Sequence, residues 1–191
     1  FSWLRRLSDG PGSFMYSGFN PFPQTSDAFY GYQSDFFSSW GWGGHGCHWR
    51  NFRGFEHANG GLIPDLERKR QIADDSYTKL VCNYWKWRLN RDISIGLLDW
   101  AAEFSAFNYL YGVKCLRPYS WNLVCNIGFD QWASNTHRVD PSMPLLPTKL
   151  HYNTGIAPEP LARSLNREFF NKRLDHRRFA RSLMRLRLLL P

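Results

Sequence analysis

The chain has 191 residues, of which 43% are hydrophobic and 17% aromatic, so it can form the core of one domain. Its formal net charge is +8, but nine Lys or Arg residues and only two acids lie between Arg163 and Arg187, so the rest of the chain is near neutral, at +1. This composition excludes a disordered chain and a domain that is basic throughout, and it indicates a near-neutral domain with a basic tail.

The cysteines exclude two further classes of protein. Cys47, Cys82, Cys115 and Cys125 are widely spaced without a CxxC pair, which excludes a zinc ribbon and a disulfide framework and mildly favours a reducing intracellular compartment. No run of about 18 apolar residues occurs, so no transmembrane helix is predicted. The sequence begins at Phe1 and not at Met, which indicates a removed leader or a piece of a longer protein.

The first half of the chain predicts short strands followed by helices. Residues 14–17 are expected to form a strand between Gly-, Pro- and Ser-rich loops. Aromatic and small polar residues alternate over 29–42 and lead into a glycine cluster at 41–46, which predicts a strand and then a flexible loop at the edge of a cleft. Pro64 indicates a helix start, and one or two helices are expected over 62–90.

The clearest helix is predicted at 97–111, after an N-cap region near Asp92. Its apolar residues share one stripe of a helical wheel, whereas Asp99 and Glu103, four residues apart, lie together on the other side. Gly112 is expected to end the helix, because glycine adopts the left-handed conformation of a C-terminal cap at little cost.

The last part of the chain predicts two short strands, an arm and a helical tail. The strands are expected at 113–116 and 123–127. Five prolines between 141 and 160, without apolar periodicity, indicate a linker or an extended arm. From 161 to 191 apolar residues recur at helical intervals among arginines, which predicts one or two basic amphipathic helices. The sequence is thus divided into a domain at 1–140, the arm and the tail.

Five motifs follow one another in a fixed order between residues 13 and 140. They are Ser17-Gly-Phe-Asn20, Trp40-Gly-Trp42, Asp99-Trp100, Asn122-Leu-Val-Cys-Asn-Ile-Gly-Phe129 and Thr136-His137. In this order they resemble the C-terminal half of a nucleotide-sugar glycosyltransferase of the GT-A type, similar to glycosyltransferase family 2. The N-terminal half of such an enzyme, which holds the donor nucleotide and its metal, is not matched by this sequence.

The resemblance implies an α/β fold, a partial GT-A-like mixed sheet with flanking helices that binds its ligand at the carboxyl edge of the sheet. It also implies transfer of a sugar from a nucleotide-sugar donor to a hydroxyl group of a carbohydrate acceptor. Asp99 is then expected to be the base, with Glu103 as its neighbour or substitute. Trp40, Trp42 and Trp100 are expected to bind the acceptor, because indole faces stack on sugar rings. The alternatives are a solvated helix face for the acids and a core pair for the tryptophans.

The resemblance places one metal ligand in this sequence. His137 is expected to help hold Mn²⁺ or Mg²⁺. No Asp-x-Asp pair occurs in the chain, so His137 could act as a ligand only if a partner chain or an upstream segment supplies the donor half. Otherwise it is a structural residue. His45 and His48, with Cys47 between them, have a spacing that fits a metal, but structural or exposed histidines explain it better.

The basic tail has several interpretations. Arg173, Arg177, Arg178 and Arg181 are the expected contacts for an anion or a partner, and RNA phosphate, an anionic membrane and a partner helix all fit them. Solvated charge on a docked helix is the alternative. A second function therefore stays open, namely a non-catalytic structural subunit with a degenerate glycosyltransferase fold, whose tail binds RNA or partner proteins in a larger assembly.

Overall fold

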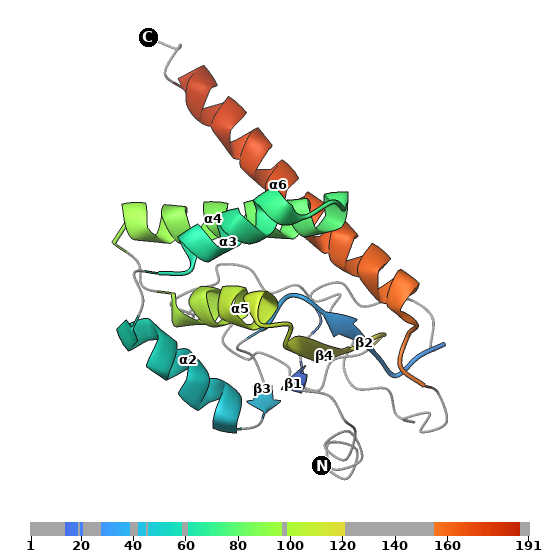
Figure 1. Cartoon of the computed structure of the whole chain (residues 1–191). Helices are drawn as coiled ribbons and strands as arrows, with labels where there is room; N and C mark the ends of the chain where they lie inside the picture. The colour runs from blue at the N-terminus through green and yellow to red at the C-terminus, as the bar shows by residue number, and fades with distance from the viewer. Residues whose placement is uncertain are drawn as a thin grey trace, which may run out of the picture.

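The computed structural model describes residues 14–18, 20, 28–38, 42–44, 46–58, 61–96, 99–120 and 155–187, apart from the side chains of residues 14, 56–58 and 176–187. The elements of this part, labelled in Figure 1, are β1 (Phe14–Ser17), β2 (Gly31–Ser34), β3 (Trp42–Gly44), α2 (Gly46–Ala58), α3 (Ile63–Ile72), α4 (Ser76–Ser94), α5 (Trp100–Leu110), β4 (Lys114–Pro118) and α6 (Glu159–Arg187). The described residues thus form an α/β structure of five helices and one mixed sheet flanked by helices, which confirms the predicted α/β class.

The sheet has four strands in the order β2-β4-β1-β3. Strands β1 and β4 are parallel, whereas β2 is antiparallel to β4 and β3 is antiparallel to β1. Parallel neighbours need a crossover connection, and α2, α3, α4 and α5 all lie between β1 and β4 in the sequence. The carboxyl ends of β1 and β4 meet at one edge of the sheet, which we call the carboxyl edge.

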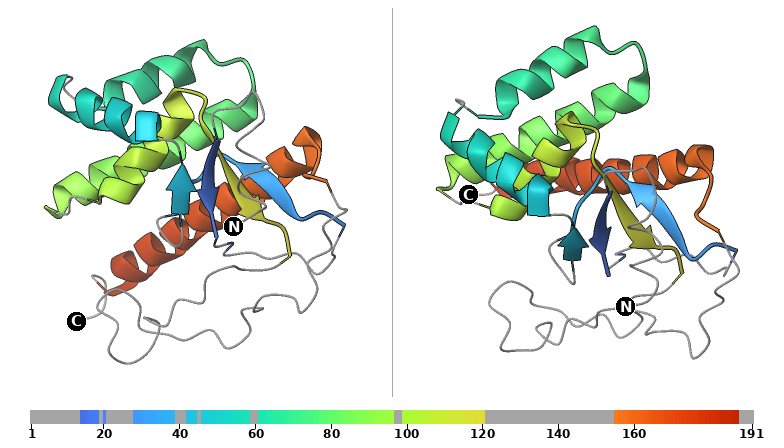
Figure 2. Two further views of the ribbon diagram at one scale, coloured as in Figure 1. Left: turned by 90° about the horizontal axis from the view of Figure 1, so that it is seen from below. Right: turned by 60° about the horizontal axis from the view of Figure 1, so that its bottom comes forward.

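The helices pack around α5 and against the sheet. Helix α5 contacts α2, α3 and α4, and α3 and α4 contact each other along much of their length. Figure 1 shows α5 between the α3–α4 pair and α2. Helix α6 contacts α4 and β2, and Figure 2 shows it crossing the sheet.

One large core joins all five helices. Each helix contributes a side chain that is almost completely buried, namely Phe52 of α2, Leu66 of α3, Trp85 of α4, Phe104 of α5 and Phe170 of α6. Burial of each such side chain stabilises the fold by roughly 1.5–3 kcal/mol. The first half of α6 therefore packs into the same core as the other helices.

Several predicted elements are confirmed. The strand at 14–17 is β1, and the strand predicted at 113–116 is β4, shifted slightly towards Pro118. Two helices, α3 and α4, occupy the region expected to hold one or two, and Pro64 lies in the first turn of α3. Helix α5 forms in the predicted place, and Gly112 follows it with a φ of 71°. This positive φ is accessible to glycine without strain.

Other local predictions are wrong. Asp92 does not cap α5, because it lies inside α4, where it is buried. The N-cap of α5 is Asp99 itself, which is therefore not on the side of the helix that it was expected to share with Glu103. Residues 42–44 of the glycine cluster form strand β3 and not a flexible loop, and residues 46–58 form helix α2, which the sequence did not predict.

The arm and the tail also differ from expectation in their details. Ile156 forms a parallel bridge with Gly31, and the Ala157 amide donates to the Gly31 carbonyl over 2.9 Å, so the end of the proline-rich arm extends the edge of the sheet at β2. Helix α6 is a single helix that begins at Glu159. Among the described helices, none has a stretch apolar and long enough to cross a membrane.

Candidate functional site

Three tryptophans from three elements form one aromatic surface. The ring centroids of Trp42 on β3 and Trp100 on α5 are 6.1 Å apart, and that of Trp49 on α2 lies 6.1 Å from Trp42 and 5.7 Å from Trp100. Trp42 is 39% exposed and Trp100 is 40% exposed, so both present an indole to solvent, while Trp49 is half-buried beneath them. We call these three residues the tryptophan surface.

The core fixes the tryptophan surface from below. The Phe37 ring lies 5.5 Å from Trp42 and the Phe104 ring lies 5.4 Å from Trp49, and both phenylalanines are buried. Edge-to-face contacts of this kind hold aromatic rings in defined orientations. The exposed indoles are therefore supported by a buried aromatic layer.

The topology explains why these tryptophans meet at the carboxyl edge. In the register of β1 and β3, Trp42 pairs with Ser17, the last residue of β1. Trp100, the first residue of α5, lies with its ring centroid 6.1 Å from that of Trp42 and is therefore close to the carboxyl end of β1. Ligands of open α/β sheets bind outside the carboxyl ends of the strands.

Asp99 lies next to the tryptophan surface and caps α5. Its Oδ1 accepts hydrogen bonds from the amides of Ala101 and Ala102, over 3.1 and 3.3 Å. Its Oδ2 accepts a hydrogen bond from Arg88 Nη2 on α4 over 2.5 Å. The carboxylate is thus held between two helices, with about 30% of the side chain exposed. A carboxylate has about four acceptor positions, and the donors among the described residues use three of them.

Arg88 is held by a second acid. Its Nε donates to Oδ2 of Asp92 over 2.8 Å, and the Asp92 side chain is only 6% exposed. Burial disfavours the charged form of the guanidinium, but the hydrogen bond and the negative charge of Asp92 outweigh it and raise the pKa of Arg88. Arg88 is therefore a fixed positive charge that joins Asp92 to Asp99.

Glu103 lies one turn into α5, partly buried and close in sequence to the cap. A negative charge in the first turn interacts favourably with the helix dipole. The structure thus brings four of the predicted site residues, Asp99, Glu103, Trp42 and Trp100, to the carboxyl edge of the sheet.

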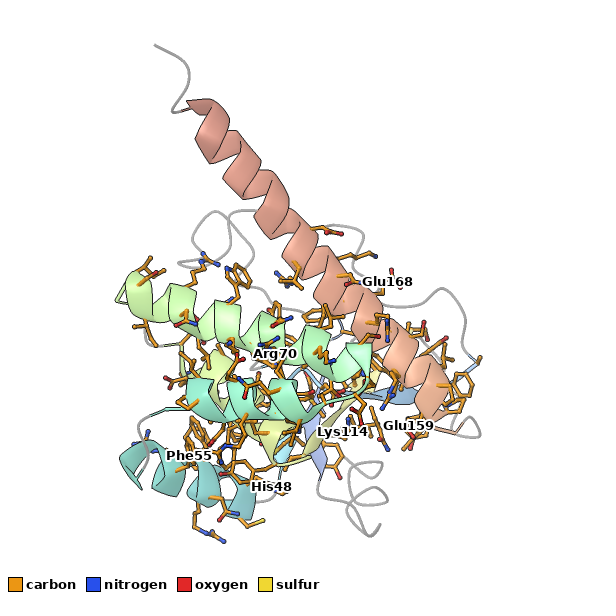
Figure 3. All side chains as sticks on the ribbon, turned by 45° about the horizontal axis from the view of Figure 1, so that its top comes forward. His48, Phe55, Arg70, Lys114, Glu159 and Glu168 are labelled. Carbon is orange, nitrogen blue, oxygen red and sulfur yellow. The ribbon has the colours of Figure 1, made fainter. Side chains whose placement is uncertain are left out.

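The remaining predicted site residues are placed elsewhere or lie outside the described part. Trp40, His45 and His137 are outside it, as is the strand predicted at 123–127. His48 is buried on α2, where Figure 3 labels it, and Cys47 beside it is exposed. Within the described stretches no group of three or more His, Cys, Asp or Glu side chains could hold a metal ion.

The tail arginines are described only in part. The guanidinium of Arg173 lies over the ring of Phe169, 5.5 Å from its centroid, and the residue is exposed. The side chains of Arg177, Arg178 and Arg181 lie outside the described residues, although the helical backbone that carries them is described.

Three members of the site were not predicted as site residues from the sequence. Arg88 and Asp92 are four residues apart on α4, a spacing that favours an ion pair, and this signal could have been recognised. Trp49 is three residues before Phe52, a spacing that places two residues on one face of a helix. This spacing is informative only once residues 46–58 are known to form helix α2.

A second charged cluster lies away from the carboxyl edge. Tyr77 of α4 donates a short hydrogen bond to Oδ2 of buried Asp35, and Lys114 Nζ at the start of β4 lies 2.5 Å from Oδ1 of the same carboxylate. Burial is the main reason why the pKa of Tyr77 is raised. The carboxylate of Asp35 is thus paired within the protein, which indicates a structural role.

Comparisons with protein-family models, with curated proteins and with solved structures find no match to this chain.

Proposed function

We propose that this chain is part of a glycosyltransferase of the GT-A type, and that the carboxyl edge of its sheet binds the carbohydrate acceptor. The observation that carries the proposal is the pair of exposed indoles, Trp42 and Trp100, with centroids 6.1 Å apart at the start of α5, the helix that Asp99 caps. The order of the sequence motifs supports the same function. The mixed sheet is compatible with a partial GT-A fold, because its parallel pair creates the edge at which such sheets bind ligands.

The chemistry of a sugar fits this surface. One face of a pyranose ring presents C–H groups that pack on an indole, while the hydroxyl groups at its rim need hydrogen-bond partners. Trp42 and Trp100 provide the apolar faces. Asp99 provides an acceptor at the rim, because the donors among the described residues use three of the about four acceptor positions of its carboxylate.

Asp99 is also the proposed base. In the transfer step the acceptor oxygen forms a bond to the anomeric carbon of the donor, the bond from that carbon to the nucleoside diphosphate breaks, and the hydroxyl proton passes to the carboxylate. Arg88 holds Asp99 in place through a 2.5 Å contact, so the carboxylate is oriented before the acceptor binds. Glu103 is the proposed substitute if the acceptor binds further along α5.

The metal and the donor are not assigned to described residues. Within the described stretches no cluster of side chains fits Mn²⁺ or Mg²⁺. The role of His137 as a metal ligand stays a prediction. We propose that the donor nucleotide and its metal are bound with the help of a partner chain or an upstream segment.

Acceptor binding is tested by isothermal titration calorimetry of the chain against a panel of mono- and oligosaccharides. We expect at least one carbohydrate to bind, and Trp42→Ala and Trp100→Ala each to weaken its binding about tenfold, since an aromatic contact contributes roughly 1.5 kcal/mol. The matched control is Trp87→Ala, which removes a half-buried indole of α4 and should leave the affinity unchanged. Equal affinities for all these variants would contradict the proposed acceptor surface.

Transfer is tested by incubating the chain with a nucleotide sugar, the bound carbohydrate and Mn²⁺. Asp99→Asn keeps the shape and the helix cap but removes the proton acceptor, so we expect it to lower the rate about 10²- to 10⁴-fold, far more than it weakens acceptor binding. A thermal-shift titration with nucleotide sugars shows beforehand whether the donor binds. If it does not, the assay requires the segment or partner that carries the donor half. Carbohydrate binding without transfer in that complete system would favour the non-catalytic subunit.

A further inference from the structure

Helix α6 has two halves of different composition. Residues 159–175 contain four cations and three acids, so their net charge is +1. Residues 176–187 contain five arginines and no acid, so their net charge is +5. The change occurs within one continuous helix of 29 residues.

The first half of α6 is fixed to the body of the protein. Phe169 and Phe170 are buried in the main core, and Asn166 Nδ2 donates to the carbonyl of Gln33 on β2 over 2.9 Å. Figure 3 labels Glu159 and Glu168 on this half, and their carboxylates form ion pairs with cations one turn further along the helix. The charges of the first half are thus balanced locally.

The second half of α6 runs beyond the other helices and the sheet. Figures 1 and 3 show this half projecting from the body, while the first half lies along α4 and β2. Twelve residues at about 1.5 Å each give a projecting segment about 18 Å long. Since the first half is anchored, the direction of this segment is set by the fold.

The sequence of the second half is amphipathic on a helical backbone. At about 100° per residue, Phe179, Leu183 and Leu186 fall within about 60° of one another. Arg178, Arg181 and Arg185 fall within about 60° of one another on the other side of the wheel. An apolar stripe of this kind on a helix that leaves the body needs a partner surface.

We propose that residues 176–187 of α6 bind the surface of an anionic lipid bilayer. Such a helix lies in the plane of the interface, with its apolar face among the acyl chains and its arginines at the headgroups. This inference is independent of the proposed sugar transfer.

An anionic membrane fits both features of the segment, whereas RNA and a second copy of this chain each fit only one. RNA phosphate would use the arginines but would leave the stripe of Phe179, Leu183 and Leu186 without a function. A second copy of the chain would cover the stripe but would bring five arginines close to five others, with no acid in either segment to compensate. Only a surface that is both apolar and anionic uses the whole segment.

The experiment is co-sedimentation of the full chain with vesicles of phosphatidylcholine alone and of phosphatidylcholine with phosphatidylglycerol at 3:1. We expect binding to the anionic vesicles and little binding to the neutral ones. The triple variant Arg177→Gln, Arg178→Gln, Arg181→Gln should weaken this binding about 100-fold, because each cation near an anionic surface contributes roughly fivefold. The control carries Arg50→Gln, Arg68→Gln and Lys79→Gln, at exposed positions of α2, α3 and α4, and should bind as the wild type does.

The apolar stripe is tested with the triple variant Phe179→Ser, Leu183→Ser, Leu186→Ser, which keeps every arginine. We expect it to lose binding to the anionic vesicles at 150 mM salt, while circular dichroism shows an unchanged melting temperature. The proposal is overturned if this variant binds like the wild type, if the control and the arginine variant are equally weakened, or if generic RNA displaces the vesicles. It is equally overturned if the wild-type chain forms dimers that only the serine variant dissociates.

Discussion

Arg88 of α4 donates to the same carboxylate of Asp99 that caps α5, with Nη2 and Oδ2 2.5 Å apart. The two amides of the first turn of α5 bind the other oxygen of this carboxylate. One side chain therefore fixes the start of α5 and its position relative to α4. Because Trp100 is the first residue of α5, the same contacts also position one side of the tryptophan surface.

The two functions of Asp99 in the fold are separable by substitution. Asn caps helices about as well as Asp, so Asp99→Asn should lose mainly the ion pair with Arg88, whereas Asp99→Ala should lose the cap as well. We expect Asp99→Ala to lower the free energy of unfolding by about 1 kcal/mol more than Asp99→Asn does. Urea denaturation followed by circular dichroism measures the difference. Equal losses of unfolding free energy for the two variants would mean that the helix cap contributes nothing to stability.

The sequence predicted best the elements that have strong local signals. Helix α5 has an apolar stripe and a following glycine, and α3 begins at a proline, so propensity and packing agree. Helix α2 was missed because Gly46 and Gly54 lower its intrinsic helix propensity by about 1 kcal/mol each. Its formation depends on packing of Phe52 against α5, a tertiary contact that no local pattern reveals.

The candidate site was predicted in part. The resemblance assigned Trp42 and Trp100 to one surface, and the structure places their rings side by side, although 57 residues of chain separate them. Asp99 was expected on the side of a helix. Its role as the N-cap of α5 was missed because Asp92, seven residues earlier, is the same residue type and was predicted to be the cap. The clamp by Arg88 could not be foreseen, since it depends on how α4 and α5 pack.

Gly31 of β2 lies too close to β4 for a side chain. A Cβ atom at this position would lie 2.7 Å from the carbonyl oxygen of Arg117, and backbone cannot move away as a flexible side chain can. We expect Gly31→Ala to lower the free energy of unfolding by about 1–3 kcal/mol. Gly43→Ala on β3 is the matched control, because a Cβ there meets no atom within 4 Å. Urea denaturation of both variants measures these free energies of unfolding. A larger loss of unfolding free energy for Gly43→Ala than for Gly31→Ala would be inconsistent with the β2–β4 register.

Phe170 tests whether the first half of α6 belongs to the core. Its ring is 0% exposed and lies 5.1 Å from Tyr84 and 6.2 Å from Trp85 of α4. Phe170→Ala should therefore cost about 3–5 kcal/mol in the free energy of unfolding. Lys172→Ala, two residues away and exposed, should cost less than about 1 kcal/mol, since its ion pair with Glu168 lies at the surface. If α6 were a separate tail, neither substitution would change the unfolding of the remaining helices.

Alkaline pH should destabilise the protein through buried thiol and phenol groups. Burial raises the pKa of Cys115 from its ordinary value of 9.0 to about 11, and it also raises the pKa of Tyr84. Below pH 9 the Cys115 thiol is protonated in both the folded and the unfolded chain, so its contribution to stability is fully present. Above pH 9 the unfolded chain loses this proton first, and stability falls until the folded thiol ionises near pH 11. The expected loss from Cys115 is about 1.4 kcal/mol per pH unit.

Urea denaturation at intervals between pH 8 and 10 measures this slope in the wild type and in two alanine variants. Cys115→Ala removes the buried thiol of β4 and should make the fall in unfolding free energy with pH less steep. Cys47→Ala removes the exposed thiol of α2 and should leave the slope as it is in the wild type. Because burial also raises the pKa of the Cys82 thiol, some slope should remain in Cys115→Ala. A free energy of unfolding that stays constant or rises from pH 8 to pH 10 would contradict the burial of these groups, since a raised folded pKa can only reduce stability as the pH increases.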